Sequence, residues 1–270
     1  KTFARTLKKW VYPTERVELT MASKRRGSEE VDEYFATTQC RMRFIVNHLN
    51  DVDSTECGIC DNCTRNKLNV EFSPAELADA QNYLRHGYLK IEPRRKNWDN
   101  RNIAAAEQLM EGKALSKWKD GGFGDLVVRG KQIEHQFADE LVDAVAAMIS
   151  GWSISERPTW ITCIPSTKSG DLVPNFARRL AVELKIPFLA AITKLRSTAP
   201  QKGMENSAHQ GANVSGAFKI VGDLPLGPVF LVDDLVDSRW TLTEVGRILR
   251  QHGSGNVYPV ALASTQSGDS

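Results

Sequence analysis

The 270-residue sequence contains no apolar run that approaches the ~18 residues of a membrane-spanning helix, and it opens with no signal-peptide pattern. These absences predict a cytosolic chain without a membrane partner. The G-x-x-x-x-G-K-[ST] pattern, which forms a loop around the phosphates of ATP, is also missing, so the chain is not expected to hydrolyse ATP by itself. A net charge of +2 is too small to indicate a nucleic-acid partner, because binding to phosphates depends on local basic surface.

An initiating methionine is lacking as well: the sequence begins at Lys1, and we expect it to be part of a longer chain. Hydrophobic residues make up 41% and charged residues 25% of the sequence, a composition typical of globular proteins that argues against extensive disorder. At roughly 100–200 residues per domain, the length indicates two domains.

Cysteine is scarce, and four of the five cysteines fall in one short region, at Cys40, Cys57, Cys60 and Cys63. Disulfides are disfavoured in the cytosol, where closely spaced cysteines more often hold a metal. The last three form C-x-x-C-x-x-C, and with the first they can place four thiolates around zinc and leave no open position for a substrate. We therefore expect a structural zinc site, with an iron–sulfur cluster or unligated thiols as the alternatives. Cys163, in an apolar segment, is expected to be a core residue.

The stretches CRMRFIVNHL and CGICDNC resemble the zinc-binding module of the RecQ family of DNA helicases, and all four ligand positions match. The resemblance implies an ATP-dependent 3′–5′ DNA helicase as the parent protein, with DNA and the helicase motor lobes as partners. ATP would bind only in those motor lobes, which this chain lacks. In a bacterium such a protein would be cytoplasmic and associated with the nucleoid.

Four regions are expected along the chain. They are residues 1–39, the end of a preceding helicase region with a connecting helix; residues 40–66, the zinc-binding module; residues 67–130, a linker of helices and loops; and residues 131–270, an α/β domain. The first dozen residues alternate enough to predict a strand. Within the linker, Ser73 followed by Pro74 and Glu76 has the pattern of a capping box and predicts the start of a helix.

Basic residues surround a tryptophan in the stretch Arg94, Arg95, Lys96 and Trp98. Such a combination can bind phosphates and stack on bases, so these residues are candidates for DNA contacts. The alternative is that they pack a junction between domains, which is the commoner role of such a stretch.

The second half of the sequence alternates apolar strands with helical patterns, which predicts a parallel sheet flanked by helices. Its first helix is expected to place Ile133, Phe137, Leu141, Val145 and Met148 on one face. The predicted strands have the sequences PTWITCIP, PFLAAIT, AFKIV, VFLVDDL and VYPVALA.

The segment VFLVDDLVDSRWTLT, residues 229–243, joins an apolar strand to a helix. In open parallel sheets, ligands bind beyond the carboxyl ends of the strands. Backbone N–H groups at the start of the helix, with the hydroxyls of Ser238 and Thr241, can bind a phosphate. Asp233 and Asp234 can accept hydrogen bonds from a ribose diol or hold a hydrated Mg²⁺. Phosphoribosyl pyrophosphate combines a phosphate, a diol and a diphosphate that binds Mg²⁺.

This segment resembles the phosphoribosyl-pyrophosphate motif of type I phosphoribosyltransferases, which implies their fold for this half of the chain. The resemblance assigns Asp233 and Asp234 to the ribose, Asp237 to a catalytic position near the nucleobase, and Ser238 and Thr241 to the 5′-phosphate.

The family commonly has glycine where this chain has Arg239, which is followed by Trp240. Either both side chains point away from the loop, with Arg239 free to add a phosphate contact, or they fill the site.

Two further segments resemble parts of such enzymes. CIPSTKSGDLVP takes the place of the pyrophosphate loop, with donors at Ser166, Thr167, Lys168 and Ser169. TAPQKGMENSAHQGANVSGAF resembles the mobile loop of ComF-type phosphoribosyltransferases but lacks their several arginines.

Together the two halves resemble bacterial RecQ-like helicases of the RqlH type, which carry a C-terminal phosphoribosyltransferase domain. Three interpretations follow: an accessory helicase region whose second domain binds a nucleotide-type ligand or partner, a working transferase that acts on a base or nucleotide in DNA repair, or a scaffold without a ligand. The acids and hydroxyls argue against the scaffold, while Arg239, Trp240 and the loop poor in arginine argue against a conventional transferase. We expect the first, because function depends on the site rather than on the fold.

Overall fold

The computed structural model describes residues 11–51, 54–65, 71–166, 170–196 and 207–265. The chain divides into two compact units, Lys1–Phe72 and Ser73–Ser270, called here the N-terminal and C-terminal units. Among the described residues, no helix is both long enough and apolar enough to cross a bilayer.

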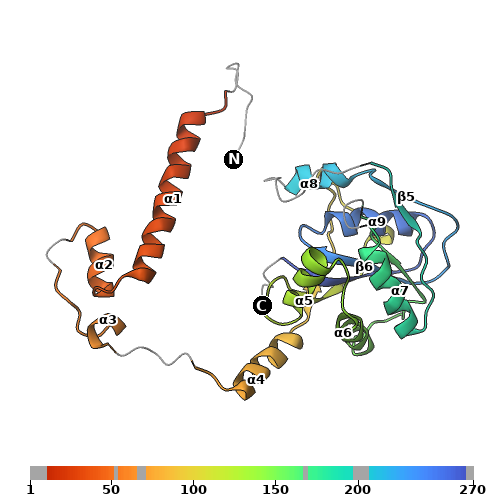
Figure 1. Ribbon diagram of the computed structural model, residues 1–270. Helices are drawn as coiled ribbons and strands as arrows, with labels where there is room; N and C mark the ends of the chain where they lie inside the picture. The colour runs from red at the N-terminus through yellow and green to blue at the C-terminus, as the bar shows by residue number, and fades with distance from the viewer. Residues whose placement is uncertain (1–10, 52–53, 66–70, 167–169, 197–206, 266–270) are drawn as a thin grey trace. The chain divides into compact units, whose positions relative to one another are not determined.

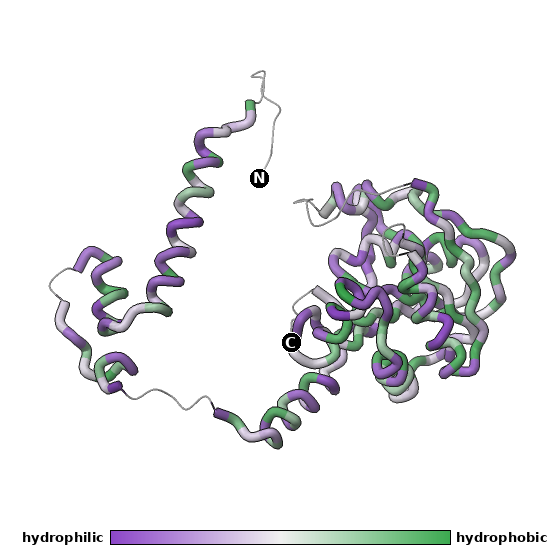
Figure 2. The backbone as a smooth tube through the Cα atoms, viewed as in Figure 1, coloured by the Kyte–Doolittle hydropathy of each residue, from purple (hydrophilic) through white to green (hydrophobic). Residues whose placement is uncertain are grey.

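The described residues of the N-terminal unit form three helices, α1 (Thr14–Ala36), α2 (Arg41–His48) and α3 (Asp61–Thr64) (Figure 1). α1 matches the predicted connecting helix, and it is mostly hydrophilic and buries no side chain (Figure 2). The strand predicted for the first dozen residues lies largely outside the described part of the chain. This unit therefore has very little hydrophobic core of its own.

The C-terminal unit is built on a five-stranded sheet in the order β1-β2-β7-β6-β3, in which only β1 is antiparallel. The strands are β1 (Leu89–Ile91), β2 (Gly112–Lys117), β3 (Trp160–Cys163), β6 (Val229–Val236) and β7 (Val257–Ser264). The predicted α/β class with a mainly parallel sheet is confirmed. β6, which carries the candidate ligand segment, lies between β3 and β7 and is buried on both sides, as its apolar sequence requires.

Helices cover both faces of this sheet (Figure 1). α5 (Phe123–Arg129), α6 (Asp139–Ser150) and α7 (Leu172–Leu184) pack on one face together with Phe230 and Val232 of β6. α9 (Trp240–Gln251) packs on the other face with Val229 and Leu231. Cys163 is buried in the first of these cores, as predicted.

Two of the predicted strands form a separate antiparallel pair instead of joining the main sheet. β4 (Ile192–Lys194) pairs with β5 (Phe218–Ile220), whereas both had been expected among the parallel strands. Each has three residues, of which only the first is buried, so neither strand has the fully apolar sequence of a strand inside a parallel sheet. α8 (Ser207–Val214) precedes β5.

Residues 67–130, expected to be a linker, contain structure that belongs to this sheet. The predicted helix is present as α4 (Pro74–Arg85), with the capping box between Ser73 and Glu76 formed. β1, β2, α5 and the short 3-10 helix η1 (Ala105–Glu107) follow, and the compact unit accordingly begins at Ser73 rather than at residue 131. The short strands were not predicted because the basic and Gly-rich composition of this stretch is typical of loops.

The helix predicted from Ile133 onward is broken. Residues Gly130–Glu134 form a π-helical turn, η2, and His135 adopts a left-handed φ of 53°, so α6 begins only at Asp139. Ile133 is 72% exposed as a result, although the other four residues of the predicted face are buried. The break brings the side chain of Lys131 to the end of β6.

Candidate functional sites

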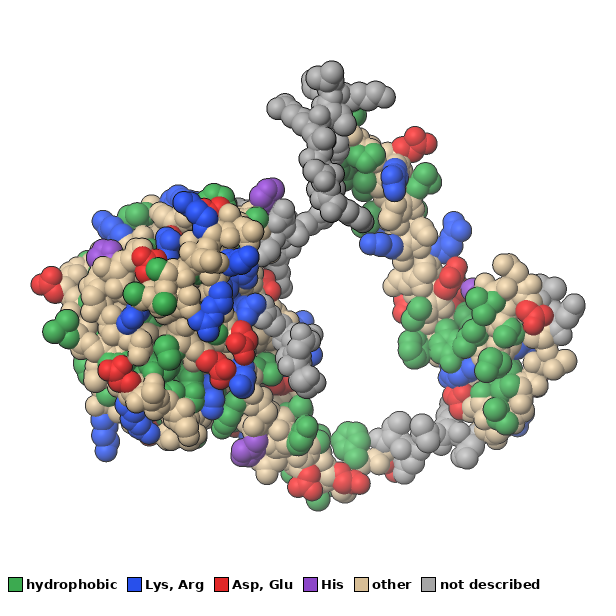
Figure 3. Space-filling view, turned by 180° about the vertical axis from the view of Figure 1, so that it is seen from behind, with side chains coloured by type: hydrophobic (Ala, Val, Ile, Leu, Met, Phe, Trp, Pro, Cys, Tyr) green, Lys and Arg blue, Asp and Glu red, His purple; other side chains and the backbone are tan. Residues whose placement is uncertain are grey.

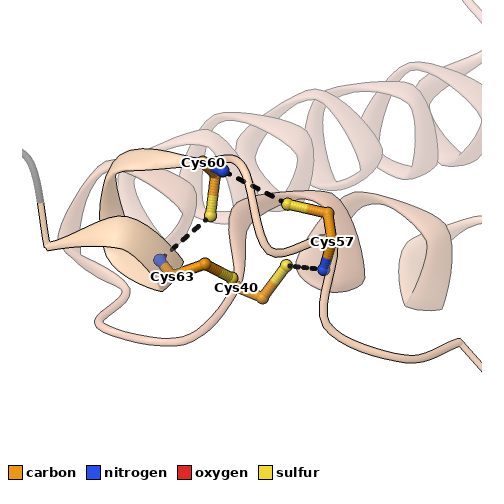
Figure 4. Close-up of side chains that lie close together, drawn as sticks. All are labelled: Cys40, Cys57, Cys60 and Cys63. Atoms are coloured by element: carbon orange, nitrogen blue, oxygen red, sulfur yellow. Dashed lines mark hydrogen bonds between the residues drawn. The ribbon is translucent and has the colours of Figure 1, made fainter.

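Four cysteines of the N-terminal unit converge on one point. The Sγ atoms of Cys40, Cys57, Cys60 and Cys63 all lie within 4.8 Å of one another, and this is the one such cluster found among the described residues. Figure 4 shows the four side chains gathered together. Cys40 is the N-cap of α2, and Cys60 is the N-cap of α3, so two helix starts direct their sulfurs inward. The predicted four-cysteine site is formed.

Backbone N–H groups stabilise negative charge on these sulfurs. The Sγ of Cys40 accepts hydrogen bonds from the N–H of Cys57 at 3.2 Å and of Arg43 at 3.5 Å, and these donors lower its pKa to about 6. Cys57 and Cys60 each accept one such bond, from the N–H groups of Cys60 and Cys63. Desolvation, with a hydrogen bond that the Cys63 thiol donates to Cys60, raises the pKa of Cys63 to about 12. Binding of a cation would displace the remaining thiol protons and leave four adjacent thiolates around the ion.

The cluster fits zinc. Four sulfurs at ~2.3 Å from a central ion form a tetrahedron whose edges are roughly 3.8 Å, within the 4.8 Å limit observed here. Four thiolates close the coordination shell, so the ion would hold the short helices α2 and α3 together and take no substrate. In a unit with so little core, that link has a structural role.

Side chains around the cluster tie it to the end of α1. Arg41 forms a two-pronged ion pair with Asp61, at 2.6 and 2.9 Å, and also donates to the carbonyl of Tyr34. Asn62 donates to the carbonyls of Thr37 and Gln39. The sequence analysis did not identify these supports, although Arg41, Asp61 and Asn62 all adjoin cysteines.

The second candidate site lies at the carboxyl end of β6 in the C-terminal unit. Because successive strand residues point to opposite faces of a sheet, the side chains of Asp233 and Asp234 lie on opposite faces. Asp234 is 6% exposed and pairs with Lys131, whose Nζ lies 2.5 Å from Oδ2. Lys131 was not identified from the sequence, since 103 residues separate the partners.

Asp233 faces the loop that leads into α9. Its Oδ1 accepts a hydrogen bond from the Asp234 N–H at 2.9 Å. Burial, reinforced by the nearby charge of Asp234, raises the pKa of Asp233 to about 8. A carboxyl group that keeps its proton near neutral pH can both donate and accept hydrogen bonds, as a diol requires.

A small hollow of about 40 Å³ opens beside Asp233. Its lining includes four further residues of the predicted ligand segment, Asp237, Ser238, Arg239 and Thr241, but not Asp234. The Asp237 Oδ1 accepts a hydrogen bond from the Thr265 hydroxyl at 2.8 Å, which fixes this carboxylate from the end of β7. The structure thus brings together five of the six predicted residues of this segment and places the sixth against Lys131.

Of the bulky pair after Ser238, Arg239 lines the hollow and Trp240 does not. Trp240 is 4% exposed and belongs to the core under α9, and Arg239 donates from Nη1 to the Glu92 carbonyl at 3.0 Å. Arg239 has a left-handed φ of 65°, the conformation that a glycine adopts without strain. An arginine here therefore occupies a backbone conformation that favours glycine.

The predicted pyrophosphate loop follows β3, the neighbour of β6 in the sheet. Ser166 forms an antiparallel bridge with Gly170, so the chain turns back at this point. Thr167, Lys168 and Ser169 lie outside the described residues.

The four residues of the predicted DNA-binding stretch differ in burial. Arg94 is half-buried, with its guanidinium carbon 3.5 Å from the centre of the Trp240 ring. Arg95 and Lys96 are exposed, and Trp98 is 43% exposed. On the face shown in Figure 3, lysines and arginines of the C-terminal unit are spread among acidic and hydrophobic side chains. Arg94 thus packs inside the unit, while the other three remain accessible.

Comparison with known protein families gives one match, to the family described as RecQ zinc-binding, over residues 4–64. This stretch contains all four cysteines. Among curated proteins, a ribose-phosphate pyrophosphokinase of Wolinella succinogenes is 28% identical over 86 residues. That match covers 30% of this chain and 28% of the relative, so the chain spans less than a third of that protein.

Solved structures that are similar to this chain include phosphoribosyltransferases. An orotate phosphoribosyltransferase from Aeropyrum pernix has 19% identity and a TM-score of 0.33, covering 48% of this chain and 60% of that one. An adenine phosphoribosyltransferase has 14% identity and a TM-score of 0.35, covering 68% of this chain and 89% of that one.

Proposed function

We propose that this chain is an accessory C-terminal region of a RecQ-like DNA helicase, in which a structural zinc module precedes a domain that binds a phosphoribosyl ligand. The match of residues 4–64 to the RecQ zinc-binding family and the four converging sulfurs support the first part. The motor lobes and DNA are then its partners, and the bacterial cytoplasm, beside the nucleoid, is its location. ATP hydrolysis belongs to the motor lobes of the parent protein.

One observation carries the second part of the proposal. The hollow at the carboxyl end of β6 combines the carboxyl group of Asp233, the hydroxyls of Ser238 and Thr241, and the start of the twelve-residue helix α9. A helix start favours a phosphate because its N–H groups and dipole point toward the anion. A buried carboxyl group favours hydroxyls. A ribose 5-phosphate group presents both chemistries.

Mg²⁺ fits this site only as part of the ligand. Asp234 already binds the ammonium of Lys131, and the pKa of Asp233 is raised to about 8, so the two carboxyls do not offer a free pair of charged oxygens. The diphosphate of phosphoribosyl pyrophosphate would supply the oxygens that Mg²⁺ prefers. The protein residues would then orient the ribose and its 5-phosphate.

An active phosphoribosyltransferase, acting on a base or nucleotide in DNA repair, is the second candidate function. Asp237 favours it, because this carboxylate lines the hollow and is fixed by Thr265. A nitrogen of the base would bond to C1′ of the ribose as the bond to diphosphate breaks, and Asp237 would hold the proton that the nitrogen loses.

Titration calorimetry of phosphoribosyl pyrophosphate with Mg²⁺ into the whole chain tests the ligand site. Binding is expected, and a Ser238→Ala/Thr241→Ala variant should weaken it, because it removes two hydroxyls and leaves the acids and Lys131 in place. Asp143→Asn, an exposed carboxylate on α6, is the matched control and should bind like the parent. If the folded, zinc-loaded parent binds nothing, the ligand proposal is wrong.

If binding is found, incubation of the complex with nucleobases separates the two candidate functions. Release of diphosphate that depends on one base and is lost in Asp237→Asn would establish the transferase. Binding without release under any base supports the accessory role.

A further inference from the structure

Two arginines connect the loop between β6 and α9, residues 237–239 and called here the phosphate loop, to the segment that follows β1. Each arginine donates a hydrogen bond to the segment that contains the other. Arg94 Nη1 donates to the Ser238 carbonyl at 3.1 Å, and Arg239 Nη1 donates to the Glu92 carbonyl at 3.0 Å. We call these two bonds the reciprocal link. They join residues more than 140 positions apart and fix the loop from both sides.

Arg94 is held in place by an aromatic ring. Its guanidinium carbon lies 3.5 Å from the centre of the Trp240 ring, which is the distance of a planar stack. Trp240 in turn is packed against α8, because a Cβ added at Gly211 would come within 3.0 Å of the ring. Arg94 therefore has a defined position, unlike a surface arginine that moves with solvent.

The arrangement places two positively charged guanidinium groups near each other in a partly buried position. The Arg94 and Arg239 guanidiniums lie close enough that burial and the charge of Arg239 lower the pKa of Arg94. The buried Nε atoms of both side chains have no hydrogen-bond partner within the described part of the chain. Arg239 also keeps a left-handed φ of 65°, a backbone conformation that strains a non-glycine residue. These features destabilise the arginine pair, and the two hydrogen bonds of the reciprocal link offset part of that free energy.

The bond from Arg94 has a geometric consequence for the loop. The peptide between Ser238 and Arg239 is trans and planar, so its C=O and N–H point in opposite directions. Because Arg94 holds the Ser238 carbonyl, the Arg239 N–H is turned to the opposite side of the loop. Arg94 thus sets the orientation of a donor at the start of α9.

We propose that Arg94 is a positioning residue for the phosphate loop: by holding the Ser238 carbonyl it aims the Arg239 N–H at the 5-phosphate of a bound ribose. The inference rests on the proposed ligand site and adds to it. Arg94 itself acts through the peptide and does not touch the ligand. Glycine at the loop position would reach the left-handed conformation alone, whereas an arginine there needs this external support.

The test compares Arg94→Met with Arg95→Met, its exposed neighbour. The methionine at position 94 keeps an apolar contact with Trp240 but removes the donor. Hydrogen exchange measured by mass spectrometry should show faster exchange of the amides in residues 238–241 for Arg94→Met only. Ribose 5-phosphate should bind about tenfold more weakly to this variant, as expected for a lost hydrogen bond, whereas Mg²⁺-pyrophosphate should bind as it does to the parent.

Three outcomes are decisive. Unchanged exchange in residues 238–241 would overturn the positioning role whether or not a ligand binds. Equal weakening for ribose 5-phosphate and pyrophosphate would also overturn it, because a general loss of structure affects both ligands. If the parent binds neither ligand, the ligand proposal fails, and the exchange measurement still decides whether Arg94 fixes the loop.

Discussion

Replacing Asp233 by asparagine should stabilise the C-terminal unit, and the gain should grow as the pH rises. Burial and the neighbouring Asp234 raise the pKa of the Asp233 carboxyl from 3.8 to about 8. The asparagine oxygen can still accept the hydrogen bond that the Asp234 N–H now donates to Asp233, at 2.9 Å. The substitution therefore removes a titrating charge with little change of shape.

The size of the effect follows from proton linkage. Between about pH 4 and about pH 8 the folded chain keeps a proton on Asp233 that the unfolded chain has lost. The free energy of unfolding therefore falls as the pH rises, by at most about 1.4 kcal/mol per pH unit. Above this window both states are ionised, and the full cost is present. Across three pH units the ceiling is roughly 4 kcal/mol, and since local relaxation reduces such costs, we expect about 1–3 kcal/mol.

Urea unfolding followed by tryptophan fluorescence at pH 5 and pH 8 measures this difference, because five of the six tryptophans lie in the C-terminal unit. The stability advantage of Asp233→Asn over the parent should be larger at pH 8 than at pH 5. Asp143→Asn, the same chemical change on an exposed part of α6, should show no such growth. An equal advantage at both pH values would refute the argument, because it would mean that Asp233 does not titrate between them.

Two further predictions concern the zinc module and DNA. Cys57→Ser leaves three thiolates, so the metal content measured by plasma mass spectrometry should fall from about one zinc per chain toward zero. The thermal stability of the N-terminal unit should fall with it. Retained zinc with an unchanged melting temperature would contradict the four-thiolate site. Arg95→Glu places an acid on the exposed basic stretch, so fluorescence anisotropy should show weaker DNA binding and a smaller dependence on salt than the parent. Arg157→Glu makes the same charge change at another exposed position, and equal behaviour of the two variants would assign the stretch to packing.

The sequence predicts those features that depend on local spacing. Cysteines separated by two residues must lie on one turn, and the fourth cysteine caps the helix beside them, so the metal cluster was predictable. An apolar run such as VFLV fits only a strand buried on both faces, and this placed the acids of residues 233–237 at the strand end. The capping box at Ser73 similarly marks the start of α4.

Features that depend on distant partners were not predictable in this way. The pairs Lys131–Asp234 and Arg94–Trp240 join residues more than 100 positions apart, and no local pattern specifies either. The short strand β1 has too few residues to show a period. β4 was predicted as a strand, but its antiparallel pairing with β5 depends on a partner about 26 positions away that no local pattern specifies. A single sequence also gives no sign that Trp240 turns into the core.

The π-helical turn Gly130–Glu134 makes the position of Lys131 depend on the number of residues in this segment. A π turn accommodates one residue more than an α-helical turn, and in many proteins it marks a functional site. Loss of one residue before Lys131 would rotate its side chain by roughly 100° around the helix axis and leave Asp234 buried without its cation. Substitutions on the exposed side of this turn should therefore be tolerated, whereas single-residue insertions and deletions should not, and related chains should share both the length of this segment and the lysine at position 131.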